Sequence, residues 1–169
     1  FKHVAGFFDK GQSPKNSNFY GKLKCSRAWR FERNGEDKPF QKYLEKMQKK
    51  KGATGLIRGW HGTRTENLMG ISKSGLLMPE NLPKGVHITG KAFGMGIYHA
   101  PCWEDAGQER KDDKGKKYTR YNGALKSMNY TSMRGAYYDS GASGKLGYMF
   151  LQEIALGVPE VHLTACWNK

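Results

Sequence analysis

A histidine and a glycine follow a bulky tryptophan in the stretch "GWHGTRTENLMGISKSGLL", and this histidine, His61, is the first side chain placed to do chemistry. Two later stretches carry similar candidates: "GKAFGMGIYHA" contains Tyr98, and "KSMNY" contains Ser127 and Tyr130. Taken singly, each has an ordinary structural explanation, because strand-end histidines are usually satisfied polar groups, glycines form turns and tyrosines fill cores. One motif alone therefore leaves a structural and a functional role open.

The sequence gives little reason to expect a bound metal, a disulfide framework or a membrane span. His99 and Cys102 have the spacing of metal ligands, but no second such pair exists, so no metal is expected. The cysteines are far apart and odd in number, which favours a reducing intracellular compartment, the nucleus or the cytoplasm. No apolar run approaches the ~20 residues of a membrane span, so no membrane partner is expected.

The chain is strongly basic. Lysine and arginine outnumber aspartate and glutamate by 29 to 15, which gives a formal net charge of +14. Residues 22–51 hold eleven basic against four acidic residues, and residues 110–120 hold six against two. Such a balance indicates a polyanionic partner, most often nucleic acid, although two solvated faces are the plain alternative. We expect non-specific nucleic-acid contact through these two stretches.

Short strands must carry the candidate side chains. Residues 27–33, "RAWRFER", alternate in character, which predicts a strand with Trp29 and Phe31 on one face. Residues 55–60 predict a second strand that ends directly before the histidine. Residues 145–157 are apolar on both faces, which predicts the central strand of the sheet.

Two helices are predicted around the second strand. The first begins after Asp37, a possible cap, and is ended by Gly52. Its apolar stripe consists of Phe40, Tyr43, Leu44 and Met47. Thr65 can cap the second helix, which Gly75 ends. With 169 residues the chain is long enough for one domain, and the fold class expected is α+β with a split, mostly antiparallel sheet and short helices.

Together the motifs resemble the catalytic domain of poly(ADP-ribose) polymerases. "LIRGWHGTRTENLMGISKSGL", "ITGKAFGMGIYHA", "ALKSMNY" and "GYMFLQEIALG" follow one another in that family's order. The similarity is strong over residues 59–100, good over 124–157 and weaker over 26–58. It leaves residues 1–25 uncovered. These residues lack periodicity and are interpreted as an N-terminal arm or tail. Residues from about 102 to 123 are interpreted as a basic insertion. It implies the diphtheria-toxin-like ADP-ribosyltransferase fold of the His-Tyr-Glu class.

The resemblance implies that the substrate is NAD+ and that the bond between nicotinamide and ribose is broken. It gives His61 and Tyr98 the catalytic positions, the first on a ribose hydroxyl and the second packed beside the nicotinamide. Gly62 would expose its backbone N–H and C=O to the carboxamide, with no Cβ in the way. The resemblance also implies NAD+-binding roles for four further residues. Thr63 and Asn67 would lie near the adenosine half, and Ser127 and Tyr130 would contact the nicotinamide.

Three departures from the family pattern accompany the match. The family's catalytic glutamate lies on a strand beyond the "GYMFLQEIALG" strand, and Glu153 belongs to that matching strand itself, so we see no residue for this role. Met95 stands where many members have lysine, and Leu77 where an arginine near the adenine is common. Because the chain also starts at Phe1 rather than methionine, we expect a fragment with weak activity of its own.

Two functions from different classes remain open. The first is an NAD+ ADP-ribosyltransferase that transfers one or many ADP-ribose units to a protein or nucleic-acid acceptor. The second is an inactive module of the same fold that binds nucleic acid or a nucleoprotein. The presence of His61, Tyr98 and Tyr130 together favours the enzyme. In both cases the catalytic-type domain is expected over 26–169, incomplete at its C-terminus.

Overall fold

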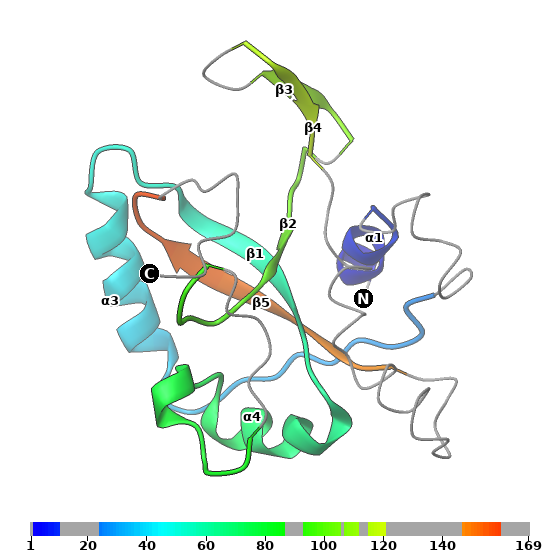
Figure 1. The fold of residues 1–169 in the computed structure, drawn as a ribbon, viewed down its shortest axis with the longest axis vertical. Coiled ribbons are helices and arrows are strands. Elements are labelled where there is room, and N and C mark those ends of the chain that lie inside the picture. Colours follow the sequence, from blue (N-terminus) through cyan, green and yellow to red (C-terminus); the bar gives the residue numbers. More distant parts are fainter. Residues whose placement is uncertain are drawn as a thin grey trace.

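The computed structural model describes residues 2–10, 24–86, 93–105, 107–111, 115–120 and 147–159 of the chain. These residues form short helices and small antiparallel sheets, which confirms the predicted α+β class (Figure 1). The helices are α1 (Lys2–Lys10), α3 (Asp37–Gln48) and α4 (Leu68–Ser74), with 3-10 turns at Thr65–Asn67 and Pro79–Asn81. The strands are β1 (Gly55–Gly62), β2 (Ala100–Cys102), β3 (Glu109–Lys111), β4 (Lys117–Thr119) and β5 (Met149–Leu156).

The main sheet has the strand order β2-β1-β5, and both pairings are antiparallel. The predicted strand over 55–60 is confirmed as β1, which runs two residues further and includes His61 and Gly62. Strand β5 was predicted to be central, but within the described residues β1 is the middle strand and β5 pairs along one edge only. An apolar pattern on both faces reports burial, and it does not say which neighbour supplies that burial.

Helix α1 corrects the expectation that the first residues form only an arm or tail. Phe8 is 4% exposed and packs edge-on against Trp60, which is 3% exposed, with 6.1 Å between the ring centres. Val4 and Phe7 pack partly buried around the same cluster. Residues 4, 7 and 8 have the spacing of one helical face. This apolar face is short, and it is buried by its contact with Trp60.

Helix α3 packs beside β5 and β1 through Leu44 and Met47, which are both buried. The predicted apolar stripe is confirmed for Leu44 and Met47, whereas Phe40 is half-buried and Tyr43 is 52% exposed. The predicted cap is wrong, because Glu36 occupies the N-cap position without a side-chain hydrogen bond and Asp37 is the first helical residue. The helix ends at Gln48, so Gly52, with a φ of 82°, lies in the following turn and does not itself end the helix.

The predicted strand over 27–33 is not formed, because this segment has no paired strand within the described residues. Trp29 and Phe31 are 70% and 60% exposed. Arg33 fixes the end of the segment instead: its guanidinium donates to the backbone carbonyl of Ile71 at 2.9 Å and pairs with Glu36 at 2.6 Å.

Gly75 ends α4 as predicted, and we expect Gly75→Ala to destabilise the fold by about 1–3 kcal/mol. Its φ of 81° disfavours any side chain, and an added Cβ would lie 2.7–2.9 Å from the guanidinium of Arg33. The matched change is Gly70→Ala in the same helix, where a Cβ meets nothing within 4 Å and is expected to be neutral or stabilising. Urea unfolding of both variants tests this, and equal losses would contradict it.

Strands β3 and β4 form a hairpin that projects from the end of β2 (Figure 1). Its base is held by Asp105, which pairs with Arg110 and, at 3.7 Å, with Arg120. The guanidinium of Arg120 lies 4.3 Å from the ring centre of Trp103. The stretch interpreted as a basic insertion thus contains a hairpin whose strand residues are largely exposed and whose base is held by ion pairs. None of the helices described is long and apolar enough to cross a membrane.

Candidate functional site

His61 lies near the end of β1, where that strand pairs with Phe150 of β5. Its Nδ1 atom is 3.0 Å from the backbone carbonyl oxygen of Tyr98. A carbonyl oxygen can only accept, so Nδ1 carries the hydrogen and donates it. In the neutral ring this leaves Nε2 as an acceptor, and the part of the chain that the structure describes supplies no second hydrogen bond to it. The imidazole is therefore oriented to accept a hydrogen bond from a hydroxyl group.

Burial lowers the pKa of the His61 imidazole below its ordinary value of 6.5. The hydrogen bond to the Tyr98 carbonyl opposes this decrease, and the neighbouring His99 adds to it. The ring is consequently neutral at pH 7, which keeps Nε2 an acceptor. A neutral, fixed imidazole suits binding and orientation of a ligand better than it suits proton donation.

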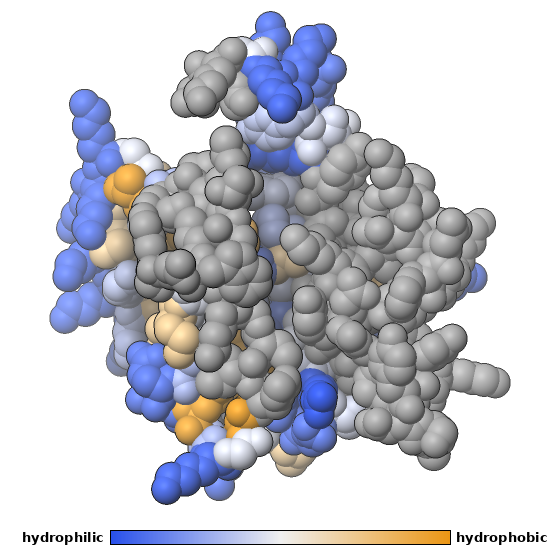
Figure 2. Space-filling model, viewed as in Figure 1, coloured by the Kyte–Doolittle hydropathy of each residue, from blue (hydrophilic) through white to orange (hydrophobic). Residues whose placement is uncertain are grey.

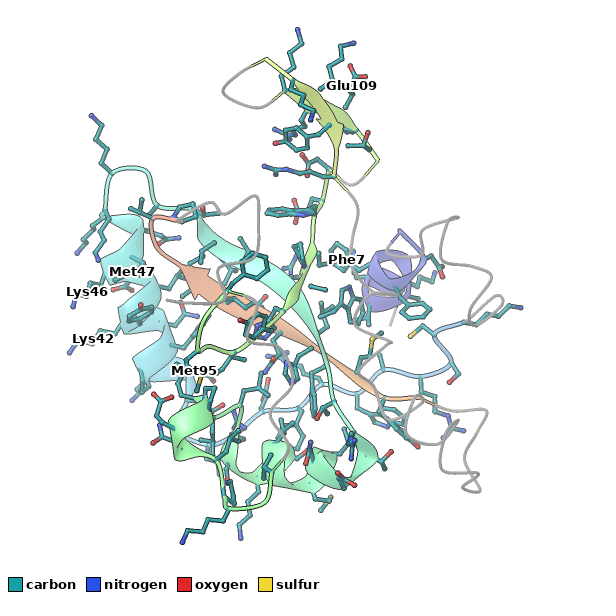
Figure 3. The ribbon with its side chains drawn as sticks, in the orientation of Figure 1. Phe7, Lys42, Lys46, Met47, Met95 and Glu109 are labelled. Atoms are coloured by element: carbon teal, nitrogen blue, oxygen red, sulfur yellow. The ribbon has the colours of Figure 1, made fainter. Side chains whose placement is uncertain are left out.

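Tyr98 precedes β2 by two residues. Its hydroxyl donates to the Gly94 carbonyl at 2.6 Å and accepts from the backbone N–H of Phe93 at 3.0 Å. The phenol therefore closes its own glycine-containing loop, while its backbone carbonyl holds His61. Met95, where many members of the similar family have lysine, is 55% exposed on that loop. Figure 3 labels Met95 on the side of β1 and β5 where α4 lies.

Thr63 and Asn67 contact each other directly after β1. The side-chain amide of Asn67 donates to the hydroxyl oxygen of Thr63 at 3.1 Å, and Thr63 is 7% exposed. This bond closes the turn that leads from β1 into α4. Gly62 lies half-buried between His61 and Thr63, so three of the predicted residues stand side by side on the chain. The remaining two, Ser127 and Tyr130, lie outside the described residues.

His99 and Gln152 join the site and were not identified from the sequence. His99 Nε2 donates to Gln152 Oε1 at 2.9 Å, and the rings of His99 and His61 have centres 5.5 Å apart. A Cβ on Gly59 would meet His99 at 2.9 Å, so that glycine provides the room for the second imidazole. The available signal was the replacement by histidine of the phenylalanine in the family's Gly-Ile-Tyr-Phe-Ala pattern.

The arrangement brings together His61, Tyr98 and His99 at the junction of β1 and the segment that leads into β2. The Nε2 atom of His61, held in place through Nδ1, offers a fixed hydrogen-bond acceptor for a polar ligand. Within the described residues no group of three or more histidine, cysteine, aspartate or glutamate side chains could hold a metal ion. What the geometry can do is orient a hydroxyl-bearing ligand.

Comparison with known proteins identifies the family. No curated protein matches the chain. The family model described as the poly(ADP-ribose) polymerase catalytic domain matches residues 1–165, which includes the first 25 residues that the motifs had left uncovered. A match over nearly the whole chain, together with the order of the motifs on β1, before β2 and on β5, settles the family. The chain belongs to the poly(ADP-ribose) polymerase catalytic-domain family, the ADP-ribosyltransferases.

Proposed function

We propose that this protein binds NAD+, cleaves its nicotinamide–ribose bond and transfers ADP-ribose to a protein or nucleic-acid acceptor. Membership in the family supports NAD+ as the substrate. The observation that carries the proposal further is the position of His61, whose Nδ1 is held by the Tyr98 carbonyl at 3.0 Å while Nε2 is left to accept. Such a group binds a ribose hydroxyl, which is the role that the sequence similarity implies.

In this proposal the residues act mainly by orientation. Neutral His61 accepts a hydrogen bond from a ribose hydroxyl, and Gly62 presents its backbone to the nicotinamide carboxamide without a Cβ in the way. Tyr98 packs beside the nicotinamide, and Tyr130 supplies an aromatic face for the charged pyridinium. Thr63, Asn67 and Ser127 complete the proposed NAD+-binding set.

The proposed chemistry is dissociative. The bond between the nicotinamide nitrogen and the anomeric carbon breaks, its electron pair leaves with nicotinamide, and an oxocarbenium-like ribose remains. An acceptor nucleophile then bonds to the anomeric carbon and gives up its proton. Positioning of the ribose and fixed dipoles directed at the developing charge lower the barrier for such a step.

A nicotinamide-like carboxamide is expected to stabilise the protein by about 2.7 kcal/mol when present at a hundredfold excess over its dissociation constant. Tyr130→Ala should remove most of this shift, because it removes the proposed stacking face. Tyr43→Ala is the matched control, since Tyr43 lies on α3 and is 52% exposed. Thermal unfolding measures the effect. No shift with either the carboxamide or NAD+ at millimolar concentration would defeat the site assignment.

The alternative of an inactive module is separated from the enzyme by turnover. The full-length protein is incubated with NAD+, and released nicotinamide and labelled acceptor are measured together. Nicotinamide release supports the proposed transferase. NAD+ binding without release would mean that the protein keeps the fold and the ligand site but not the reaction.

A further inference from the structure

Helix α3 carries a row of lysines on the face turned away from the sheet. Lys38, Lys42, Lys46 and Lys49 follow one another at intervals of four, four and three residues, and all are exposed. This spacing keeps them on one side of a helix. The opposite side holds the buried Leu44 and Met47. Figure 3 shows Lys42 and Lys46 pointing outward, and Figure 2 shows hydrophilic side chains gathered along the α3 edge.

These four residues, the lysine row, are unpaired charges. Within the described ranges of the chain none of them forms an ion pair. Several other basic side chains of the two basic stretches already form ion pairs. In the segment before α3, Arg30 pairs with Glu32 and Arg33 with Glu36, and in the hairpin Arg110 and Arg120 pair with Asp105 and Lys117 with Glu109. The lysine row is therefore a continuous group of charges on one helix face that form no ion pair within the described residues.

Helix stability does not explain the row. Lysines in a last turn, such as Lys46 and Lys49, complement the negative end of the helix dipole. Lys38 sits in the first turn, where a positive charge opposes the dipole, and Lys42 lies in the middle of the helix. The helix dipole therefore accounts for the lysines at the C-terminal end of the row and not for Lys38 and Lys42.

We propose that the lysine row binds the phosphate backbone of a nucleic-acid duplex without reading its sequence. Lys49, the C-cap residue, follows Lys38 by eleven residue steps, a distance of about 16 Å at 1.5 Å per residue. A duplex presents one negative charge for about every 1.7 Å of its axis, so a straight row of this length faces many phosphates. Proteins that bind single strands combine basic grooves with stacking side chains. The exposed aromatic residue of α3, Tyr43, is not part of the lysine row. The proposal does not rest on the transferase activity.

The test compares two triple variants of the full-length protein that lose the same charge. Lys38→Ala/Lys42→Ala/Lys46→Ala removes most of the row. Lys24→Ala/Lys73→Ala/Lys84→Ala removes three exposed lysines that lie off α3. Fluorescence anisotropy with a labelled duplex of about 20 base pairs gives the dissociation constant at several salt concentrations. Alanine favours helix, so the row variant should stay folded, and circular dichroism checks this.

The wild type should show log Kobs falling with log salt with a slope of about −3.6 or steeper, which corresponds to four neutralised phosphates. The magnitude of this slope should decrease by about 2.7 in the row variant and by less than about 1 in the control variant. Equal losses in the two variants would mean that only net charge matters, and absence of duplex binding at low salt would overturn the proposal. Tighter binding of a single strand would mean that the lysine row binds single-stranded nucleic acid rather than a duplex. Row-dependent binding to anionic vesicles in place of the duplex would mean that it binds a membrane surface. Nicotinamide release should not differ between the variants, so a failure of the duplex-binding proposal can be distinguished from a failure of the proposed transferase function.

Discussion

Replacing His61 by alanine should lower nicotinamide release from NAD+ by about 10²- to 10³-fold, the usual effect of losing one preorganised polar contact. The imidazole is half-buried, neutral and fixed by its hydrogen bond to the Tyr98 carbonyl at 3.0 Å, so it is ready to accept a hydrogen bond without reorganising. Alanine removes that acceptor and leaves the backbone of β1 paired. We therefore expect the fold to persist and the reaction to fail.

The matched control is His3→Ala, because His3 lies on α1 and is exposed. Nicotinamide release is measured for the full-length protein and both variants, with NAD+ affinity measured separately. If His61 orients the ribose, the maximal rate should fall more than the affinity. Activity of the His61→Ala variant within about threefold of the wild type would remove His61 from the proposed site.

Replacing Trp60 by alanine should cost about 3–5 kcal/mol of stability, the range for truncating a large buried aromatic side chain. Trp60 is 3% exposed, and Phe8 of α1 packs against its ring at 6.1 Å. Loss of the indole leaves α1 without its main partner and opens a cavity beneath β1. For a chain of this size the loss corresponds to a decrease in Tm of roughly 6–20 °C.

Trp29→Ala is the control for this change, because Trp29 is 70% exposed and its removal should alter stability by no more than about 0.5 kcal/mol. Trp60→Phe keeps part of the buried aromatic surface and should lose less than Trp60→Ala, which keeps the comparison informative if the alanine variant does not fold. Urea unfolding followed by circular dichroism gives the values. Equal losses for Trp29→Ala and Trp60→Ala would mean that the core is not centred on Trp60.

Local pattern was sufficient where the deciding interactions are local. The strand over 55–60, directly before His61, was predicted from its short apolar sequence and is confirmed as part of β1. The helix with Leu44 and Met47 inward was predicted from its 3.6-residue period, and Gly75 as a helix end from its need for a positive φ. The family followed from the order of several motifs, which a family-model match over residues 1–165 confirmed.

The same patterns failed where a distant partner decides. The segment with Trp29 and Phe31 alternates like a strand, yet a strand requires a neighbour to accept its backbone hydrogen bonds, and the described residues supply none. The short apolar face of α1 is too small to predict a helix by itself, since short isolated helices are only marginally stable. It forms because Trp60, more than fifty residues later, covers it.

By itself the sequence determined which residues are candidates for chemistry, the family and the overall basic charge. Only the tertiary structure decided how those groups are used. The hydrogen bond to the Tyr98 carbonyl fixes the tautomer of His61. The Tyr98 hydroxyl donates to the Gly94 carbonyl of its own loop, and Gly59, which has no Cβ, leaves room for His99 beside the site. The tertiary structure also paired Arg110, Lys117 and Arg120 with acidic side chains, whereas the four lysines of the lysine row form no ion pair within the described residues. Hydrogen bonds and ion pairs depend on distances of a few ångströms between residues far apart in the chain, and residue spacing along a sequence does not contain those distances.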